Sequence, residues 1–353
     1  MRLAEFLEMR GDKTMKELLK KAAARENLTR EEAAYAMDLI LEGKASEIEM
    51  AGFLTALRTK GETVDEIIGC AQMMKAKAGR VNLNTSDYID FVGTGGDGTN
   101  TFNISTTAMI VCAAAGVTIA KHGNRASSSK SGSADLLEAL GIEIMLEPEQ
   151  VSECINDIGV GFMMAQKFHK AMKNVANVRK ELGIRTIFNM LGPLSNPSCA
   201  TKQVIGVFDD ATVPVFANVM KAMGVKDALI VHGGDGMDEI TTTTTTLVNE
   251  IKDGKITEYK IDPADYGIAY SNPADLKGGD AEENAKIALD IFNGKKTAKR
   301  DIVVLNAAAG IYIGGKAKSI AEGVELANEI IDSGKAKAKL DELIAKTRAL
   351  ASK

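Results

Sequence analysis

The sequence of 353 residues contains no tryptophan, only three histidines and only four cysteines. The cysteines stand far apart without a Cys-x-x-Cys pair, which excludes zinc-knuckle and redox motifs: they are Cys70, Cys112, Cys154 and Cys199. We therefore expect buried free thiols in a reducing compartment. The histidines share no metal-ligand spacing, so a zinc site is not expected either.

The chain also lacks an excess of basic residues, a signal peptide and a long apolar run. Its 43 Lys and Arg against 48 Asp and Glu give a net charge of −5, which argues against binding nucleic acid by neutralising phosphates. The N-terminus is too acidic and interrupted for a signal peptide, and the longest apolar run, residues 108–120, is too short to cross a bilayer. We expect a cytoplasmic protein with no membrane and no nucleic-acid partner.

The composition that remains, 45% hydrophobic and 26% charged, is typical of a globular protein with a large core. From residue 13 to about 78 the apolar residues recur at helical spacing, which predicts a small helical region. Thr29 with Glu32, and Thr63 with Glu66, have the spacing of a capping box and predict helix starts.

After residue 82, short β-rich segments alternate with helical patterns, which predicts an α/β sheet with crossover helices. The expected strands are residues 88–92, 117–120, 160–164, 204–208 and 228–231. Helical periodicity returns after residue 280, in residues 281–292, 319–331 and 336–349. The six threonines at 241–246 favour a surface strand without a functional role.

The strongest chemical signal is a glycine-rich loop within residues 90–107, where an apolar strand is followed by Gly93, Gly95, Gly96 and Gly98. A helix is expected to begin near Ser105, so bare N–H groups and a helix N-terminus would face one ligand, as suits a phosphate. Hydroxyls of Thr101, Ser105 and Thr106 would add donors. The spacing fits neither a dinucleotide fold nor a Walker-type ATPase, and Asp97 would repel phosphate unless a metal or a ribose hydroxyl meets it.

A second strand, loop and helix of the same design follows at residues 117–140, with Gly141 as the helix stop. Its loop carries five serines together with Lys121, Arg125 and Lys130. Two such units in tandem place donors for several phosphate oxygens on one edge of the sheet. We therefore expect a polyanionic substrate.

Carboxylates and arginines complete the set of candidates. Asp238 and Glu239, after a glycine-rich turn, are oxygen ligands that suit Mg²⁺ beside a pyrophosphate. By contrast, Asp209 with Asp210 follows a strand without glycines and is interpreted as a strand end and turn. Arg179 and Arg185 each offer a planar fork for a carboxylate, and the sequence does not choose between them.

Taken together, these motifs closely resemble the anthranilate phosphoribosyltransferase family over nearly the whole chain. The resemblance is carried by residues 93–97, 103–106, 121–125, Arg179 ahead of 192–194, and Asp238 with Glu239. It implies transfer of a 5-phosphoribosyl group from phosphoribosyl pyrophosphate to anthranilate, with Mg²⁺, in tryptophan biosynthesis. It also implies a helical domain at 1–80, completed by about 174–196, and an α/β domain at 81–353 with a mostly parallel sheet of the nucleoside phosphorylase type. A homodimer through the helical domain is implied as well.

The resemblance also assigns site residues by motif position, all acting through positioning and electrostatics. The residues implied to bind phosphoribosyl pyrophosphate are Gly93, Gly96, Asp97, Thr101, Asn103, Ile104, Ser105, Thr106, Lys121, His122, Gly123, Asn124, Arg125, Ser129 and Ser133. Those implied to bind anthranilate are Gly93, Asn124 and Arg179, and those implied to bind Mg²⁺ are Ser105, Asp238 and Glu239. One departure is Lys170 after His169, where the family usually has proline, which frees the backbone φ at that position near the anthranilate entrance.

Two alternatives share this architecture. A pyrimidine-nucleoside phosphorylase prefers a Lys-x-Ser-x-Arg pattern, whereas this chain has Gly123 between Lys121 and Arg125. A non-catalytic nucleic-acid-binding relative should be basic and lack part of the glycine and Asp-Glu set, whereas this chain is acidic and retains it.

Overall fold

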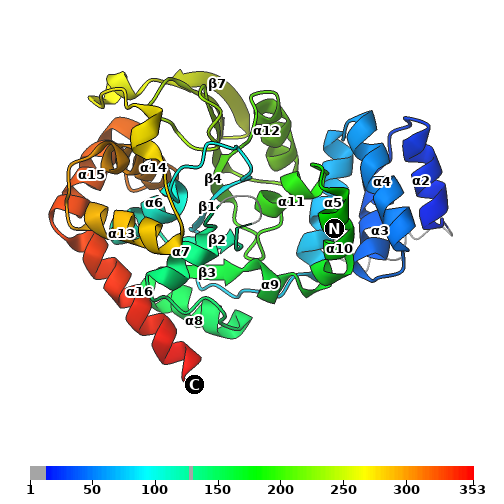
Figure 1. Ribbon diagram of the computed structural model, residues 1–353, viewed down its shortest axis with the longest axis horizontal. Helices are drawn as coiled ribbons and strands as arrows, with labels where there is room; N and C mark the ends of the chain where they lie inside the picture. The colour runs from blue at the N-terminus through cyan, green and yellow to red at the C-terminus, as the bar shows by residue number, and fades with distance from the viewer. Residues whose placement is uncertain (1–12, 127–129) are drawn as a thin grey trace.

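The computed structural model describes residues 13–126 and 130–353. Figure 1 shows a group of helices from the N-terminal part on the right and a sheet with its covering helices on the left. Residues 1–12 of the predicted helical domain, and Ser129 of the predicted substrate site, lie outside the described residues. In the described ranges no helix is both long and apolar enough to cross a bilayer.

The N-terminal helices begin at the capping residues that the sequence predicts. Thr29 and Thr63 each accept a hydrogen bond from the backbone N–H of the glutamate three residues later, and that glutamate returns a bond to the cap backbone. Thr14 and Ser46 make the same capping box. Each such cap stabilises its helix by about 1 kcal/mol. The four helices are α2 (Met15–Ala23), α3 (Arg30–Leu41), α4 (Glu47–Lys60) and α5 (Val64–Lys77).

The sheet has seven strands in the order β3-β2-β1-β4-β5-β6-β7. The first five strands along the chain are parallel, and each begins within two residues of its predicted start. They are β1 (Ile89–Gly93), β2 (Ile119–Gly123), β3 (Val160–Met164), β4 (Lys202–Gly206) and β5 (Asp227–Gly233). The α/β fold with a mostly parallel sheet is thereby confirmed. In the register, Gly93 of β1 lies beside Gly206 of β4.

An antiparallel hairpin, which was not predicted, extends the sheet with β6 (Thr246–Lys252) and β7 (Lys255–Ile261). Asp253 and Gly254 join the strands, and both have positive φ, 50° and 72°. An Asp-Gly pair with two positive φ angles is the favoured hairpin turn, so this signal was present in the sequence.

The prediction of a surface strand at residues 241–246 is wrong. Only Thr246 enters a strand, and the preceding threonines form a loop. Thr241, Thr242 and Thr246 are fully buried. Threonine favours strands through its branched side chain, but here the hydroxyls bond within the loop and with Asp235, which the residue type alone does not reveal.

Helices cover the sheet, with the apolar α6 packed against α14 near its centre (Figure 1). The predicted helices at 281–292, 319–331 and 336–349 are confirmed as α13, α15 and α16. The helices around the sheet are α6 (Ile104–Ala114), α7 (Ser133–Ala139), α8 (Pro148–Ile158), α12 (Thr212–Ala222), α13 (Ala281–Phe292), α14 (Ala298–Ile313), α15 (Ile320–Asp332) and α16 (Lys335–Ala351). Of these, α6, α8, α12 and α14 pack on strands, and the others pack mainly on neighbouring helices. The helix expected near Ser105 begins one residue earlier, at Ile104.

A second core joins the N-terminal helices to a segment from the middle of the chain. Between β3 and β4 lie α9 (Ala165–Phe168), the 3-10 helix η1 (Lys170–Met172), α10 (Lys173–Leu182) and α11 (Phe188–Leu194). Val175 and Val178 of α10 and Leu191 of α11 are buried with residues of α2 to α5. This core continues over α12 onto one face of β4 and β5, so the helical part rests directly on the sheet.

The cysteines are free, as expected, but not all are buried. Cys70, Cys112 and Cys154 are buried, and burial raises the pKa of each thiol. Cys199 is exposed, in a turn where its φ is 59°, so the expectation of burial is wrong for this residue. The turn after α11 places it at the surface, which the cysteine spacing could not indicate.

Candidate active site

The carboxyl ends of the parallel strands meet at one edge of the sheet, where ligands bind in open α/β folds. The loop after β1 passes through Gly95, Gly96 and Gly98, whose φ angles of 69°, 72° and 75° suit glycine and few other residues. Asp97 lies between them and accepts hydrogen bonds from the backbone N–H and the hydroxyl of Thr99, at 3.1 and 2.6 Å. The predicted glycine-rich loop therefore has a backbone conformation that residues with a side chain rarely adopt.

Two glycines at the strand ends admit the acidic turn after β5. A Cβ on Gly206 would lie 1.6 Å from the carbonyl oxygen of Asp238, and a Cβ on Gly93 would lie 2.3 Å from Oδ2 of Asp238. The same Oδ2 accepts a hydrogen bond from the N–H of Gly95 at 2.6 Å. Asp238 is thus held against the glycine-rich loop, as the two motifs predicted.

Glu239 lies at the other side of this turn, where its Oε1 accepts a hydrogen bond from the N–H of Ser105 at 3.0 Å. Burial raises the pKa of Asp238 and of Glu239, and the neighbouring carboxylate raises each further: Asp97 acts on Asp238, and Asp238 acts on Glu239. Crowded carboxylates of this kind are stabilised by a proton or a cation.

The donor set fits Mg²⁺. No three His, Cys, Asp or Glu side chains of the described residues converge on a point to hold a metal by themselves. Magnesium commonly takes one or two carboxylates and completes its shell with water and substrate phosphates. Asp238 and Glu239 beside a phosphate-binding loop match that mode, with Ser105 adjacent.

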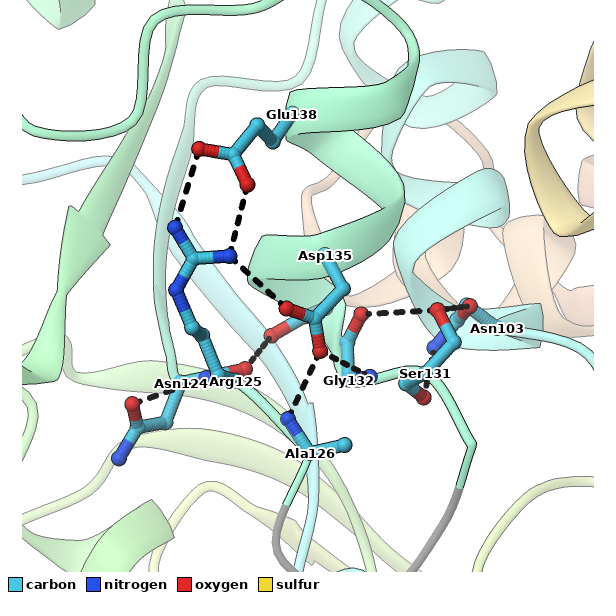
Figure 2. A network of polar contacts seen from close by, with 9 residues as sticks. Asn103, Asn124, Arg125, Ala126, Ser131, Gly132, Asp135 and Glu138 are labelled. Atoms are coloured by element: carbon cyan, nitrogen blue, oxygen red, sulfur yellow. Dashed lines mark hydrogen bonds and ion pairs between the residues drawn. The ribbon is translucent and has the colours of Figure 1, made fainter. Parts of the chain in front are cut away.

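The second predicted loop is tied to the first turn of α7 (Figure 2). Oδ2 of Asp135 accepts hydrogen bonds from the N–H groups of Ala126 and Gly132, at 2.9 and 2.8 Å, on either side of residues 127–129. The guanidinium of Arg125 bonds Asp135 at 3.0 Å and Glu138 at 2.7 and 3.0 Å. Arg125, a predicted substrate residue, thus forms ion pairs with the carboxylates of Asp135 and Glu138 on α7.

Asn103, just before α6, connects the two loops (Figure 2). Its amide donates to the carbonyl of Ser131 at 3.0 Å, and its Oδ1 accepts from the Ser131 hydroxyl and the Asn284 amide at 3.2 and 3.0 Å. The side chains of Ile104 and Thr106 are almost fully buried at the start of α6. Contact of these two residues with substrate stays a prediction.

Other predicted contacts are distributed around these loops. The hydroxyl of Ser133 donates to the carbonyl of Asn124 at 3.3 Å, where Gly123 leaves room for it. Thr101 forms an isolated bridge with Lys277, which fixes the end of the first loop. Contacts with main-chain groups therefore hold both loops in place, and the spacing of residues in the sequence could not reveal these contacts.

Lys121 and His122, the residues that end β2 with Gly123, are buried beneath the loops. The amine of Lys121 donates to the carbonyl of Phe91, and burial lowers its pKa although Asp90, Glu239 and Asp238 act in the opposite sense. The ring of His122 packs against that of His169 with 5.0 Å between centroids. Substrate contact through this buried ring stays a prediction.

The structure distinguishes the two arginines. Arg185 donates to the carbonyl of Gly96 and stacks over Phe208 at 4.3 Å, so it holds the glycine-rich loop. Arg179 is half-buried over Phe188 at 5.1 Å. The contact of Arg185 with the loop was not predicted, because the two segments are far apart in sequence.

Asp209 and Lys170, two residues considered in the sequence, lie outside the glycine-rich loops. Asp209 accepts a hydrogen bond from the N–H of Thr212 at 2.7 Å and so lies in the turn before α12, as interpreted from the sequence. Lys170, the departure from the usual proline, is exposed and begins η1 directly after His169.

Comparison with known proteins places this arrangement in a family. The model of the glycosyl transferase family a/b domain matches residues 85–337, and that of the helical bundle domain matches residues 16–78. The anthranilate phosphoribosyltransferase of Acetivibrio thermocellus is 55% identical over 338 residues, which cover 96% of this chain and 98% of that protein. The chain belongs to the anthranilate phosphoribosyltransferase family.

Solved anthranilate phosphoribosyltransferases share the fold. The crystal structure of the Thermus thermophilus protein matches with a TM-score of 0.89 and 43% identity, over 94% of this chain and 99% of that one. The Saccharomyces cerevisiae protein in complex with PRPP and Mg matches with a TM-score of 0.88 and 29% identity, over 95% of this chain and 98% of that one. Neither the nucleoside phosphorylase nor the nucleic-acid-binding alternative is supported by these relatives.

Proposed function

We propose that this protein transfers the 5-phosphoribosyl group of phosphoribosyl pyrophosphate to anthranilate, giving N-(5-phosphoribosyl)anthranilate and pyrophosphate in tryptophan biosynthesis. The observation that carries the proposal is the contact of Asp238 with the glycine-rich loop, 2.6 Å from the N–H of Gly95. It puts metal-binding carboxylates beside the backbone groups that suit a pyrophosphate. Family membership and the yeast complex with PRPP and Mg support it.

The leaving pyrophosphate would be held by the amides of residues 94–98 and by the N-terminus of α6, whose partial positive charge favours phosphate. Asp238, Glu239 and the Ser105 hydroxyl would hold Mg²⁺. When bound, this ion neutralises charge that develops on the pyrophosphate. These preformed groups act as the bond from ribose C1 to pyrophosphate lengthens and C1 gains oxocarbenium character.

Anthranilate would be oriented by Arg179, with Gly93 and Asn124 beside it. Among the described residues Arg179 has no carboxylate partner, whereas Arg185 is already bonded to Gly96. Burial lowers the pKa of Arg179, and a substrate carboxylate would restore the favourable environment of its charge. The aromatic amine is neutral at pH 7, so this chain needs to position it and does not need a strong base.

The oligomeric state, the domain boundaries and the location follow as parts of this proposal. We infer a homodimer through the helical domain, residues 1–80 completed by about 174–196, with residues 81–353 as the α/β domain. Free cysteines among the described residues accord with a cytoplasmic location.

The proposal is tested by mixing the protein, anthranilate, phosphoribosyl pyrophosphate and Mg²⁺, and following the loss of anthranilate fluorescence. Because the chain has no tryptophan, its own emission overlaps little with that signal. We expect the fluorescence to fall with Mg²⁺ and to stay constant with excess chelator. A constant signal in the presence of Mg²⁺ contradicts the proposal.

A further inference from the structure

The run of threonines at 241–246, for which no functional role was expected, follows the turn that carries Asp238 and Glu239. Thr241 and Thr242 are fully buried. The N–H of Thr241 donates to the hydroxyl of Thr246 at 3.0 Å, and the carbonyl of Thr245 accepts from the N–H of Gly234 at 2.9 Å. The run therefore folds back on the start of the acidic turn and closes a compact loop.

Asp235 is the centre of this loop. Its Oδ1 accepts a hydrogen bond from the N–H of Met237 at 3.2 Å, on the near side of the two acidic residues. Its Oδ2 accepts from the hydroxyl of Thr241 at 2.7 Å and from the hydroxyl of Thr243, on the far side. One carboxylate thus ties together the segments that precede and follow Asp238 and Glu239.

Asn306 of α14 provides a second tie at the same turn. Its Oδ1 accepts from the N–H of Ile240 at 3.0 Å, and its amide donates to the carbonyl of Ile240 at 2.8 Å. The backbone at Met237, Ile240 and Thr241 is therefore fixed, and Asp238 with Glu239 lies between the fixed points.

We propose that Asp235, through Thr241 and Thr243, is a positioning residue that fixes the Asp238 and Glu239 carboxylates for Mg²⁺. The inference rests on the proposed function, in which those two carboxylates bind the ion. Magnesium demands nearly ideal octahedral geometry, so a small displacement of either carboxylate weakens binding. Residues that orient metal ligands typically change metal affinity by roughly 10–100-fold when they are replaced.

The test measures metal binding apart from turnover. Mn²⁺ is titrated into phosphoribosyl pyrophosphate with and without the full chain, in the absence of anthranilate, and free Mn²⁺ is followed by its electron paramagnetic resonance signal. Because phosphoribosyl pyrophosphate alone also binds the ion, the additional loss of signal with the chain measures binding to the protein. Asp235→Asn removes the charge at nearly constant volume, and the double variant Thr241→Val with Thr243→Val removes the two donors. We expect each to weaken Mn²⁺ binding by roughly 10-fold or more.

The matched control is Thr242→Val, because the Thr242 hydroxyl bonds Ser271 at 3.0 Å and makes no bond to Asp235. It loses one buried hydroxyl of the same run, so a general loosening of the loop should affect it equally. We expect its Mn²⁺ affinity to match that of the unaltered chain. The Mg²⁺ concentration for half-maximal activity should rise for the Asp235 and double variants, with the anthranilate KM unchanged.

The outcomes separate this inference from the proposed function. If the unaltered chain binds no Mn²⁺ with phosphoribosyl pyrophosphate, the proposed metal site itself fails. If it binds and the Asp235 and double variants bind equally well, only the positioning role is overturned. Equal weakening in Thr242→Val also overturns it, since loosening of the whole loop then explains the loss. If Asp235→Asn does not fold, the double variant decides alone.

Discussion

At the scale of single residues, we expect replacement of the two arginines near the site to have opposite effects on the two substrate KM values. Replacing Arg179 by alanine removes a guanidinium that has no carboxylate partner among the described residues. We expect the KM for anthranilate to rise far more than that for phosphoribosyl pyrophosphate, because the lost contact orients only the acceptor. Steady-state kinetics with each substrate varied in turn measures this. Equal increases in both constants would contradict the role.

Arg185→Ala should show the reverse pattern. Its guanidinium bonds the carbonyl of Gly96 and stacks on Phe208, so its loss frees the loop that we expect to hold pyrophosphate. The KM for phosphoribosyl pyrophosphate should rise several-fold while that for anthranilate changes little. Arg185→Lys is the informative companion, because lysine keeps the charge and loses the planar stack. An unchanged KM for phosphoribosyl pyrophosphate in Arg185→Ala would exclude this role.

Gly206 is the residue at which one added methyl group should do most damage. Its Cβ would lie 1.6 Å from the carbonyl oxygen of Asp238, so Gly206→Ala must displace the acidic turn. We expect activity to fall by at least 10-fold and the turn to bind metal more weakly. The control is Gly52→Ala in α4, where the Cβ meets only the two terminal methyls of Leu19, at 3.3 and 3.4 Å. Wild-type activity in Gly206→Ala would show that the turn can move without loss.

At the scale of elements, the N-terminus of α7 should govern the second substrate loop. Asp135 accepts two backbone N–H bonds from Ala126 and Gly132, whereas the Glu138 carboxylate bonds, among the described residues, only the Arg125 side chain. Asp135→Ala should lower the free energy of unfolding by about 1–2 kcal/mol and raise the KM for phosphoribosyl pyrophosphate. Urea unfolding and kinetics check both effects.

Glu138→Ala is the matched control for that prediction. It removes an exposed ion pair with Arg125 and leaves the backbone ties of Asp135 intact. Exposed ion pairs contribute about 0–1 kcal/mol, so stability and KM should stay close to those of the unaltered chain. If the two variants behave alike, the ion pairs with Arg125, and not the backbone ties, hold the loop.

Elements differ in how far the sequence could predict them. Strands such as residues 160–164 and helices with capping boxes at Thr29 and Thr63 carry local signals, so they were predicted closely. The glycine-rich loop and the Asp238–Glu239 pair were also recognised, because in each the residues that suggest a function are close together in the sequence. The Arg185 contact with Gly96 and the role of the threonine run depend on packing between distant segments, which local pattern does not encode.

At the scale of the whole molecule, two buried histidines connect the sheet to the helical part. His122 lies one residue before the end of β2, His169 lies directly before η1, and the two rings pack together. Nε2 of His169 lies 3.1 Å from the carbonyl of Ser195. Burial lowers the pKa of His122 to about 3 and that of His169 to about 4. Both rings are therefore neutral in the folded protein at moderately acidic pH.

This pair predicts a loss of stability on acidification. The unfolded chain binds a proton at each histidine below about pH 6.5, and the folded chain does not until about pH 4 or 3, so unfolding becomes easier as the pH falls through that window. His169→Gln keeps a donor near Ser195 and removes one such site. When the pH is lowered from 7.5 to 5, the free energy of unfolding of this variant should fall by about 1–2 kcal/mol less than that of the unaltered chain. Urea unfolding at the two pH values measures this, with His232→Gln as a variant that removes a histidine outside the pair. Equal losses in the unaltered chain and in His169→Gln would show that the histidine pair does not set the acid sensitivity of the molecule.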